Sequence, residues 1–139
     1  MIAGRTITLA SQLGEIGRVV GLVEEFAAEH GLPDFVVFDV NLALDEVLTN
    51  IISYAYDDTG EHTVTVRLLL DDAALHVEVE DDGRPFDPLT VPEPDLSGPV
   101  AERPIGGLGL HLVRKLMTSL AYARKDGRNV LALTRTLQR

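Results

Sequence analysis

The stretch LALDEVLTNIISYAYDD (residues 42–58) carries a helical pattern of apolar residues and, within it, an acid and an amide. Glu46 and Asn50 are four residues apart, so on a helix they lie one above the other on the same face. Their neighbours Val47 and Ile51 belong to the apolar stripe, which places the pair at its margin. A cleft can open at such a margin, where Glu46 can act as a general base and Asn50 can bind a hard cation such as Mg²⁺. The alternative is that both side chains face solvent.

Two helices are predicted around this stretch. The first spans residues 12–30, with Ser11 as its N-cap, and Gly31 and Pro33 end it. The second begins near Asp34 and continues to about Tyr56. Its predicted apolar stripe consists of Val37, Val40, Leu44, Val47, Leu48, Ile51, Ile52 and Ala55.

Strands are predicted on both sides of these helices. Residues 5–10 alternate between polar and apolar and indicate a short edge strand. Residues 62–70 and 74–81 alternate in the same way around a turn, which is typical of an antiparallel hairpin. A third helix is predicted over residues 106–120, and residues 120–127 and 128–137 form a second hairpin.

This order of elements predicts the fold class. It indicates a two-layer α/β sandwich with a mixed or mostly antiparallel sheet and helices on one face. Regular alternation of strand and helix is absent from the pattern, which argues against a doubly wound parallel sheet. A length of 139 residues fits a single domain spanning residues 1–139.

A proline-rich segment separates the first hairpin from the third helix. Six of the seven prolines of the chain lie between Gly83 and Gly107. A long connection without regular structure inside a small domain is most often functional. We therefore expect a lid over a binding site at about residues 84–106.

Composition narrows the function. Net charge is −10, from 12 Lys and Arg against 22 Asp and Glu, so direct binding to nucleic acid is not expected. The absence of cysteine excludes disulfides and thiolate zinc sites. No signal peptide and no membrane-spanning run is visible, so we expect a cytoplasmic protein without a membrane partner.

Two further segments can contribute chemistry. Asp81 and Asp82 end a predicted strand, and one of them can accept a hydrogen bond from a ligand amino group, while Gly83 lets a ring approach the backbone. The alternative is an ordinary Asp-Gly turn. Gly106, Gly107 and Gly109 open the third helix, where free N–H groups can bind phosphate, or they form a hinge without a ligand. A cation ligand, an amino-group acceptor and a phosphate-binding helix start together predict an ATP site that needs no basic patch.

These segments resemble a known superfamily. Glu46-x-x-x-Asn50, Asp81-x-Gly83 and Gly107-x-Gly109 resemble the N, G1 and G2 boxes of the GHKL ATPases. DEVLTNIISYAY, DDGRPFDP and GGLGLHLVRKLM are similar to the anti-sigma-factor serine/threonine kinases of bacterial partner-switching systems. The resemblance covers nearly the whole chain and implies a Bergerat-type ATP-binding fold.

The resemblance also implies a role for each residue. Glu46 would be the catalytic base that activates the attacking hydroxyl, and Asn50 would hold Mg²⁺. Asp81 would accept from the adenine amino group beside Gly83, and the backbones of Gly107 and Gly109 would bind the phosphates of ATP. The implied substrate is a STAS-domain anti-anti-sigma protein, the other partner is a sigma factor, and a homodimer is possible.

The sequence departs from the family pattern at two places, of which the first concerns packing and the second leaves another function open. Tyr54 and Ala55 stand where many members have His-Gly, and Ile105 stands where some members have an arginine that reaches the γ-phosphate. Arg103 lies two residues earlier. Intact Glu46 favours a kinase. The missing arginine favours a non-catalytic ATP-binding module that sequesters a sigma factor or another regulator.

Four scattered histidines and one threonine are interpreted as structural. The histidines, at positions 30, 62, 76 and 111, have no metal-ligand spacing. Thr134 could support an adenine site through a water, but it is interpreted as an ordinary strand residue.

Overall fold

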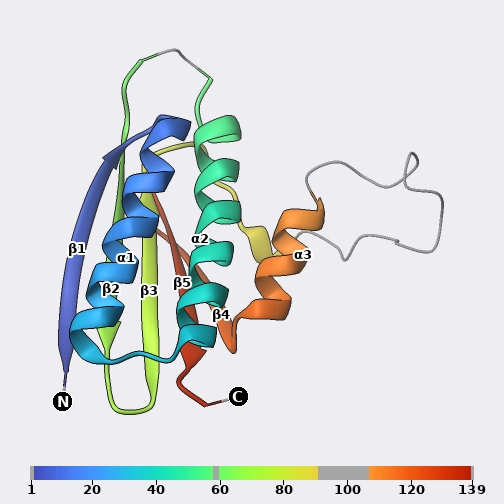
Figure 1. Ribbon diagram of the computed structural model, residues 1–139. Coiled ribbons are helices and arrows are strands. Elements are labelled where there is room, and N and C mark those ends of the chain that lie inside the picture. The colour runs from blue at the N-terminus through green and yellow to red at the C-terminus, as the bar shows by residue number, and fades with distance from the viewer. Residues whose placement is uncertain (1, 58–59, 91–106, 139) are drawn as a thin grey trace, which may run out of the picture.

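The computed structural model describes residues 2–57, 60–90 and 107–138, and its strands form one five-stranded sheet (Figure 1). The strands are β1 (Ala3–Ala10), β2 (Thr63–Leu70), β3 (Ala74–Asp81), β4 (Ser119–Lys125) and β5 (Arg128–Thr136), arranged in the order β1-β2-β3-β5-β4. Every pairing between neighbours is antiparallel. The predicted sandwich is confirmed, with an antiparallel rather than a mixed sheet.

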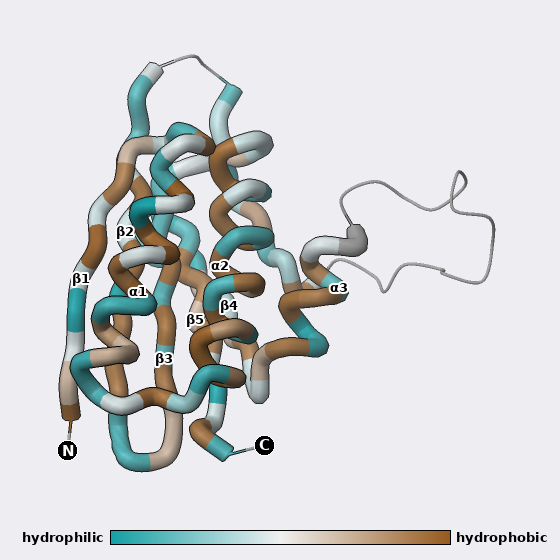
Figure 2. Tube along the Cα trace, viewed as in Figure 1, coloured by the Kyte–Doolittle hydropathy of each residue, from teal (hydrophilic) through white to brown (hydrophobic). Residues whose placement is uncertain are grey.

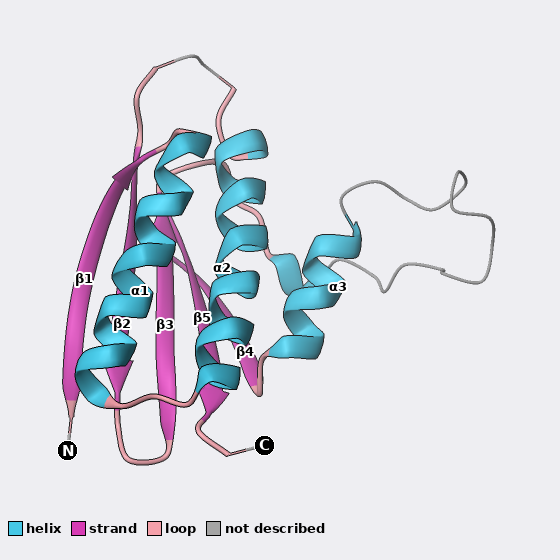
Figure 3. Cartoon of the chain, in the orientation of Figure 1, coloured by secondary structure: helices cyan, strands magenta, loops and turns pink. Residues whose placement is uncertain are grey.

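Three helices lie on one face of this sheet (Figure 3). α1 (Ile16–His30) and α2 (Asp34–Tyr54) lie side by side across the strands, and α3 (Gly107–Leu116) flanks α2. Two short 3-10 turns, η1 (Leu13–Glu15) and η2 (Pro88–Thr90), complete the described elements. No described helix has the length and apolar character needed to cross a membrane.

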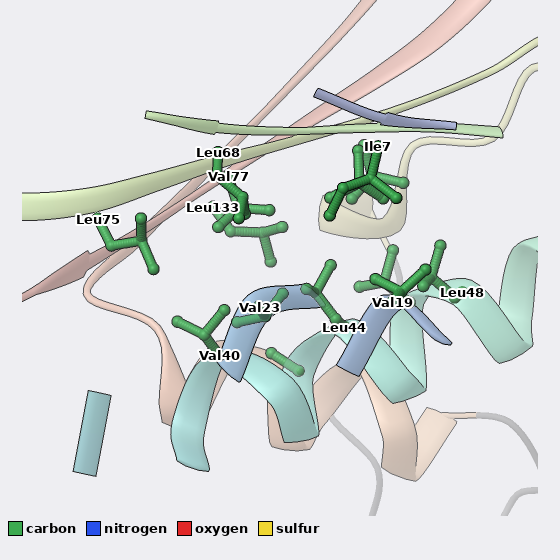
Figure 4. Packing of buried hydrophobic residues seen from close by; sticks show 14 of the residues in the cluster. Ile7, Val19, Val23, Val40, Leu44, Leu48, Leu68, Leu75, Val77 and Leu133 are labelled. Atoms are coloured by element: carbon green, nitrogen blue, oxygen red, sulfur yellow. The ribbon is translucent and has the colours of Figure 1, made fainter. Parts of the chain in front are cut away.

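The core fills the space between the helices and the sheet. Ile7, Leu68, Val77 and Leu133 point from the strands toward side chains of α1 and α2 (Figure 4). Apolar and polar residues alternate along the strands and recur around the helices, as the succession of brown and teal segments along the tube shows (Figure 2). This alternation is the physical reason that the sequence pattern predicts the fold.

The start of α1 differs from the prediction, whereas its end agrees with it. Ser11 does not cap the helix, since its Oγ accepts a hydrogen bond from His62 N at 3.3 Å. The 3-10 turn η1 follows, and α1 begins only at Ile16. Gly31 ends the helix with φ 66°, a left-handed conformation that glycine adopts without a steric cost.

The buried stripe of α2 begins at Val36, not at Val37 as predicted. Its buried members are Val36, Val40, Ala43, Leu44, Val47 and Leu48. Val36 precedes Val40 by four residues and so lies directly beneath it on the core side, which leaves Val37 partly exposed. Ile51 and Ile52 pack against the edge of the core.

The third helix ends earlier than predicted, at Leu116. The backbone N–H of Thr118 already donates to Thr134 O at 2.7 Å, so pairing with β5 begins at this point. Most of the predicted lid, including Arg103 and Ile105, lies outside the described residues. The lid and the single domain over residues 1–139 therefore stay predictions.

Candidate functional site

A cavity of 550 Å³ lies between α2, α3 and the ends of β3 and β5. Most of its wall is apolar or aromatic, as in sites that hold a flat organic ring. The cavity is lined by Val47, Asn50, Ile51, Tyr54, Ala55, Asp81, Arg84, Pro85, Phe86, Pro88, Leu110, Tyr122, Asn129 and Leu131. The structure thus brings two predicted residues, Asn50 and Asp81, to one cavity.

A second cavity of 210 Å³ shares three lining residues with the first: Asn50, Tyr54 and Leu110. Its other lining residues are Glu46, Thr49 and Gly109. Glu46 and Asn50 therefore line a common space at the margin of the core stripe of α2, and both are partly buried. Tyr54 extends the same face by one more turn and is largely exposed.

Gly109 in α3 lies directly against Glu46 in α2. A Cβ atom built at Gly109 would overlap the Glu46 carboxylate and approach its Cδ to 3.3 Å. The lack of a side chain at Gly109 therefore leaves the room that the carboxylate occupies. Gly107 is the first residue of α3, at the helix start where the sequence predicted phosphate binding.

Asp81 is the last residue of β3 and is 3% exposed. Its Oδ1 accepts hydrogen bonds from Gly83 N at 2.9 Å and from Asn129 Nδ2 at 3.1 Å. Burial raises the pKa of Asp81, and these two hydrogen bonds oppose that rise. No hydrogen bond to Oδ2 occurs within the described part of the chain, so this oxygen is the acceptor left for a group in the cavity.

Gly83 is a glycine for a reason that the sequence did not reveal. A Cβ at this position would lie 2.6 Å from both the Cβ and the carbonyl oxygen of Ala55. Gly83 thus allows the chain after β3 to pack against the end of α2. Its predicted approach to a ligand ring stays a prediction.

Arginines hold the segment that follows Gly83. Arg84 Nε donates to Tyr54 O at 2.9 Å, which caps the C-terminal end of α2. Arg124 Nη1 donates to Gly83 O at 2.8 Å from β4. Arg114 Nη2 in α3 donates to Pro88 O and Leu89 O at 3.0 Å. The cavity wall over residues 84–88 is therefore attached to the helices and the sheet.

Asn129 was not among the predicted site residues, and it pairs with Asp81 across β3 and β5. Asn129 is 6% exposed and lines the larger cavity. Its position in phase with the buried Leu131 and Leu133 was the signal available, because a polar residue on a core-facing register must find partners. Thr134 lies on the opposite face and contacts His76 at 3.3 Å, which agrees with its structural interpretation.

The side-chain oxygen atoms of Asn50 and Glu46 are of the kind that binds a magnesium ion. Asn50 and Glu46 both line the smaller cavity, and neither makes a side-chain hydrogen bond to another described residue. Hard oxygen ligands suit Mg²⁺, which usually takes one or two protein ligands and completes its shell with water and phosphate. The described residues include no cluster of three or more His, Cys, Asp or Glu that would hold a metal alone.

Comparison with known proteins gives the family. The chain matches the model of the histidine kinase-like ATPase domain over residues 9–135. The chain therefore belongs to this family, as the resemblance indicated. Membership of an ATPase family implies that the chain binds ATP. Asp81 and Asn50 both line the larger cavity.

Its relatives include serine/threonine kinases. The chain is 36% identical over 99 residues to the serine/threonine-protein kinase BtrW of Bordetella bronchiseptica, covering 70% of this chain and 68% of that protein. It is also 36% identical over 106 residues to the serine-protein kinase RsbW of Bacillus cereus, covering 73% of this chain and 64% of the relative. The chain thus spans about two thirds of the length of these relatives.

A solved structure has the same fold. The crystal structure of the RsbU and RsbW domains of a Mycobacterium tuberculosis protein superposes with a TM-score of 0.64 and 20% identity, covering 96% of this chain and 32% of that one. At this identity the match supports the fold and not a shared activity.

Proposed function

We propose that this protein is an ATP-dependent serine/threonine kinase that acts as an anti-sigma regulator in a bacterial partner-switching system. The observation that carries the proposal is the position of Glu46 and Asn50 on one small cavity, against Gly109, while Asn50 also lines the larger cavity that contains Asp81. In this proposal Glu46 is the catalytic base, and the space at Asn50 and Gly109 is the place for the phosphates of a nucleotide whose nucleobase lies at Asp81. The names of the kinase relatives support the same activity.

The proposed reaction is a phosphoryl transfer. The carboxylate of Glu46 accepts the proton of a serine or threonine hydroxyl as its oxygen bonds to the γ-phosphorus. The bond between the γ-phosphorus and the bridging oxygen breaks, and ADP leaves. Bound Mg²⁺, held by Asn50 together with the phosphates, would neutralise charge on the transferred group. Backbone N–H groups at Gly107 and Gly109 would hold the phosphates at the start of α3.

We propose that the hydroxyl belongs to a STAS-domain anti-anti-sigma protein and that the second partner is a sigma factor, as the resemblance implies. The exposed Tyr54 at the junction of the cavities supports access by a protein partner. Homodimerisation, a cytoplasmic location and a lid near residues 84–106 belong to the same proposal. The second candidate function is an ATP-binding module that sequesters a regulator without phosphorylating it.

The experiment compares two neighbouring carboxylates of α2. Purified wild-type protein, Glu46→Gln and Asp45→Asn are incubated with γ-labelled ATP, Mg²⁺ and a lysate of the source organism. Asp45 is exposed and hydrogen-bonded only to Thr49 among the described residues, so its variant is the matched control. We expect a newly labelled small protein with wild type and Asp45→Asn, and none with Glu46→Gln. Tight ATP binding without any labelled protein would instead support the sequestering module.

A further inference from the structure

Every hydrogen-bond donor and acceptor of the Asn129 side chain is paired with another group of the protein. Its Nδ2 donates to Asp81 Oδ1 at 3.1 Å and to Arg84 O at 2.8 Å. Its Oδ1 accepts from Phe86 N at 3.2 Å and from the hydroxyl of Tyr122. A carboxamide has two N–H donors and an oxygen with two lone pairs, so these four bonds satisfy it completely.

Because all its donors and acceptors are paired, the side-chain amide of Asn129 has no group left to bind a ligand. Although Asn129 lines the larger cavity, any role in ligand selection must act through the residues that it holds. All four residues that it contacts also line the cavity: Asp81, Arg84, Phe86 and Tyr122. Asn129 therefore connects the acidic floor of the cavity to the wall that follows β3.

The consequence is clearest at Asp81. Asn129 and Gly83 both donate to Oδ1, which fixes the rotation of the carboxylate and leaves Oδ2 as its free acceptor. A free carboxylate oxygen pairs with an amino group and repels a carbonyl oxygen. Purines differ in this respect at position 6, where adenine has an amino group and hypoxanthine has an oxygen.

We propose that Asn129 is the positioning residue that makes this cavity select a 6-amino purine over a 6-oxo purine. It does so by holding Asp81 in one orientation and by holding the adjoining wall at Arg84 and Phe86. The inference rests on the proposed nucleotide site, and it adds to that site a residue that determines selectivity without touching the base.

The test measures dissociation constants for ATP and for inosine triphosphate by isothermal titration calorimetry on the full chain. For wild type we expect ATP to bind at least about tenfold more tightly, since an unpaired buried acceptor is costly. In Asn129→Ala we expect ATP binding to weaken by about 10- to 100-fold, and the preference for ATP to fall to near unity. Thr134→Val, on the outer face of the same strand, should keep the wild-type ratio.

The ratio separates positioning from general support of the fold. If Asn129→Ala is folded by circular dichroism and weakens both nucleotides equally, Asn129 is only structural and the proposal is overturned. If Asn129→Ala does not fold, the same ratio is measured on the nearly isosteric variant Asn129→Asp. This variant keeps the acceptor for Phe86 N–H and puts an oxygen against Asp81. We expect that variant also to lose the preference for ATP, and an unchanged ratio would overturn the proposal. Binding of neither nucleotide by wild type would contradict the proposed function itself.

Discussion

Gly109 and Glu46 occupy adjoining space so closely that a single added methyl group at Gly109 would overlap the Glu46 carboxylate. The contact joins α3 to α2 and closes one side of the smaller cavity. The proposed base is therefore oriented by the absence of a side chain on a neighbouring helix.

Gly109→Ala tests this orientation. Alanine favours a helix by about 1 kcal/mol over glycine, and the atom that must move is the end of a flexible side chain, so stability should not fall. The carboxylate, however, must rotate away, and a displacement of about 1 Å can lower a rate by roughly 100-fold. We expect labelling of the protein substrate to fall by that order while the melting temperature is unchanged or higher. Wild-type labelling by this variant would show that the position of Glu46 is not critical.

Gly83→Ala, unlike Gly109→Ala, should lower the stability of the fold. Its Cβ would meet the main-chain oxygen of Ala55 at 2.6 Å, and backbone cannot yield as a side chain does. We expect a loss of about 1–3 kcal/mol in the free energy of unfolding, measured with urea. Gly21→Ala is the matched control, because its Cβ would have no neighbour within 4 Å and should raise stability by up to about 1 kcal/mol. Equal stability of the Gly83→Ala variant and wild type would contradict the packing explanation.

Nucleotide affinity should depend on pH through Asp81. Burial raises the pKa of this carboxyl above 3.8, and only the ionised form accepts a hydrogen bond at both oxygens. The pKa is raised only in the folded state, so protonated Asp81 contributes to the stability of the fold. This contribution is fully present below pH 3.8 and is lost as pH rises through the raised pKa. ATP binding has the opposite dependence and should weaken as pH falls toward that value.

Asp81→Asn separates the two effects. The amide keeps an acceptor for Gly83 and Asn129 but replaces the free oxygen with an amino group. We expect its free energy of unfolding at pH 7 to be no lower than that of wild type, since no charge is buried, while ATP binding is lost in calorimetry. Retained ATP affinity would show that Asp81 is not the acceptor.

A second carboxylate should determine how the β2–β3 hairpin responds to acid. Asp71 accepts hydrogen bonds from the backbone N–H of Ala73, from the His76 side chain and from the backbone N–H of Ala74. These bonds hold its pKa at about 2. A depressed pKa contributes stability that is present above pH 3.8 and is lost as pH falls through about 2. Asp71→Asn should therefore lower the melting temperature at pH 7 and flatten its decline between pH 4 and about 2. An acid profile identical to that of Asp45→Asn would exclude this contribution.

The fold was predictable because its signals are local. The stripe of α2 and the alternation of β2 and β3 each lie within one segment, and a residue such as Gly31 ends a helix through its own backbone conformation. The prediction for Ser11 was wrong because its hydroxyl found a partner in His62, which lies far away in the sequence. A capping preference is weak enough for such a tertiary contact to override it.

The site was predictable only in part, for the same reason. The spacing of Glu46 and Asn50 is a property of one helix, and it correctly indicated that both face a common space. The fit of Gly109 against Glu46, and the packing of Gly83 on Ala55, join segments whose proximity no local pattern contains. Asn129 was missed because a single polar residue at the start of a strand has no meaning until its partner on β3 is known.

The strand order has a consequence for synthesis of the protein. β5 is made after β4, yet in the sheet it lies between β3 and β4. β3 pairs with β5 across a long stretch of sequence, and such pairings are the slow steps of folding. On the ribosome, α1, α2 and the first hairpin can pack while the floor of the cavity is still missing its last strand. A nascent chain thus gains the complete lining of the larger cavity only when β5 has been inserted, so ATP binding at this cavity would report that the strand is in place.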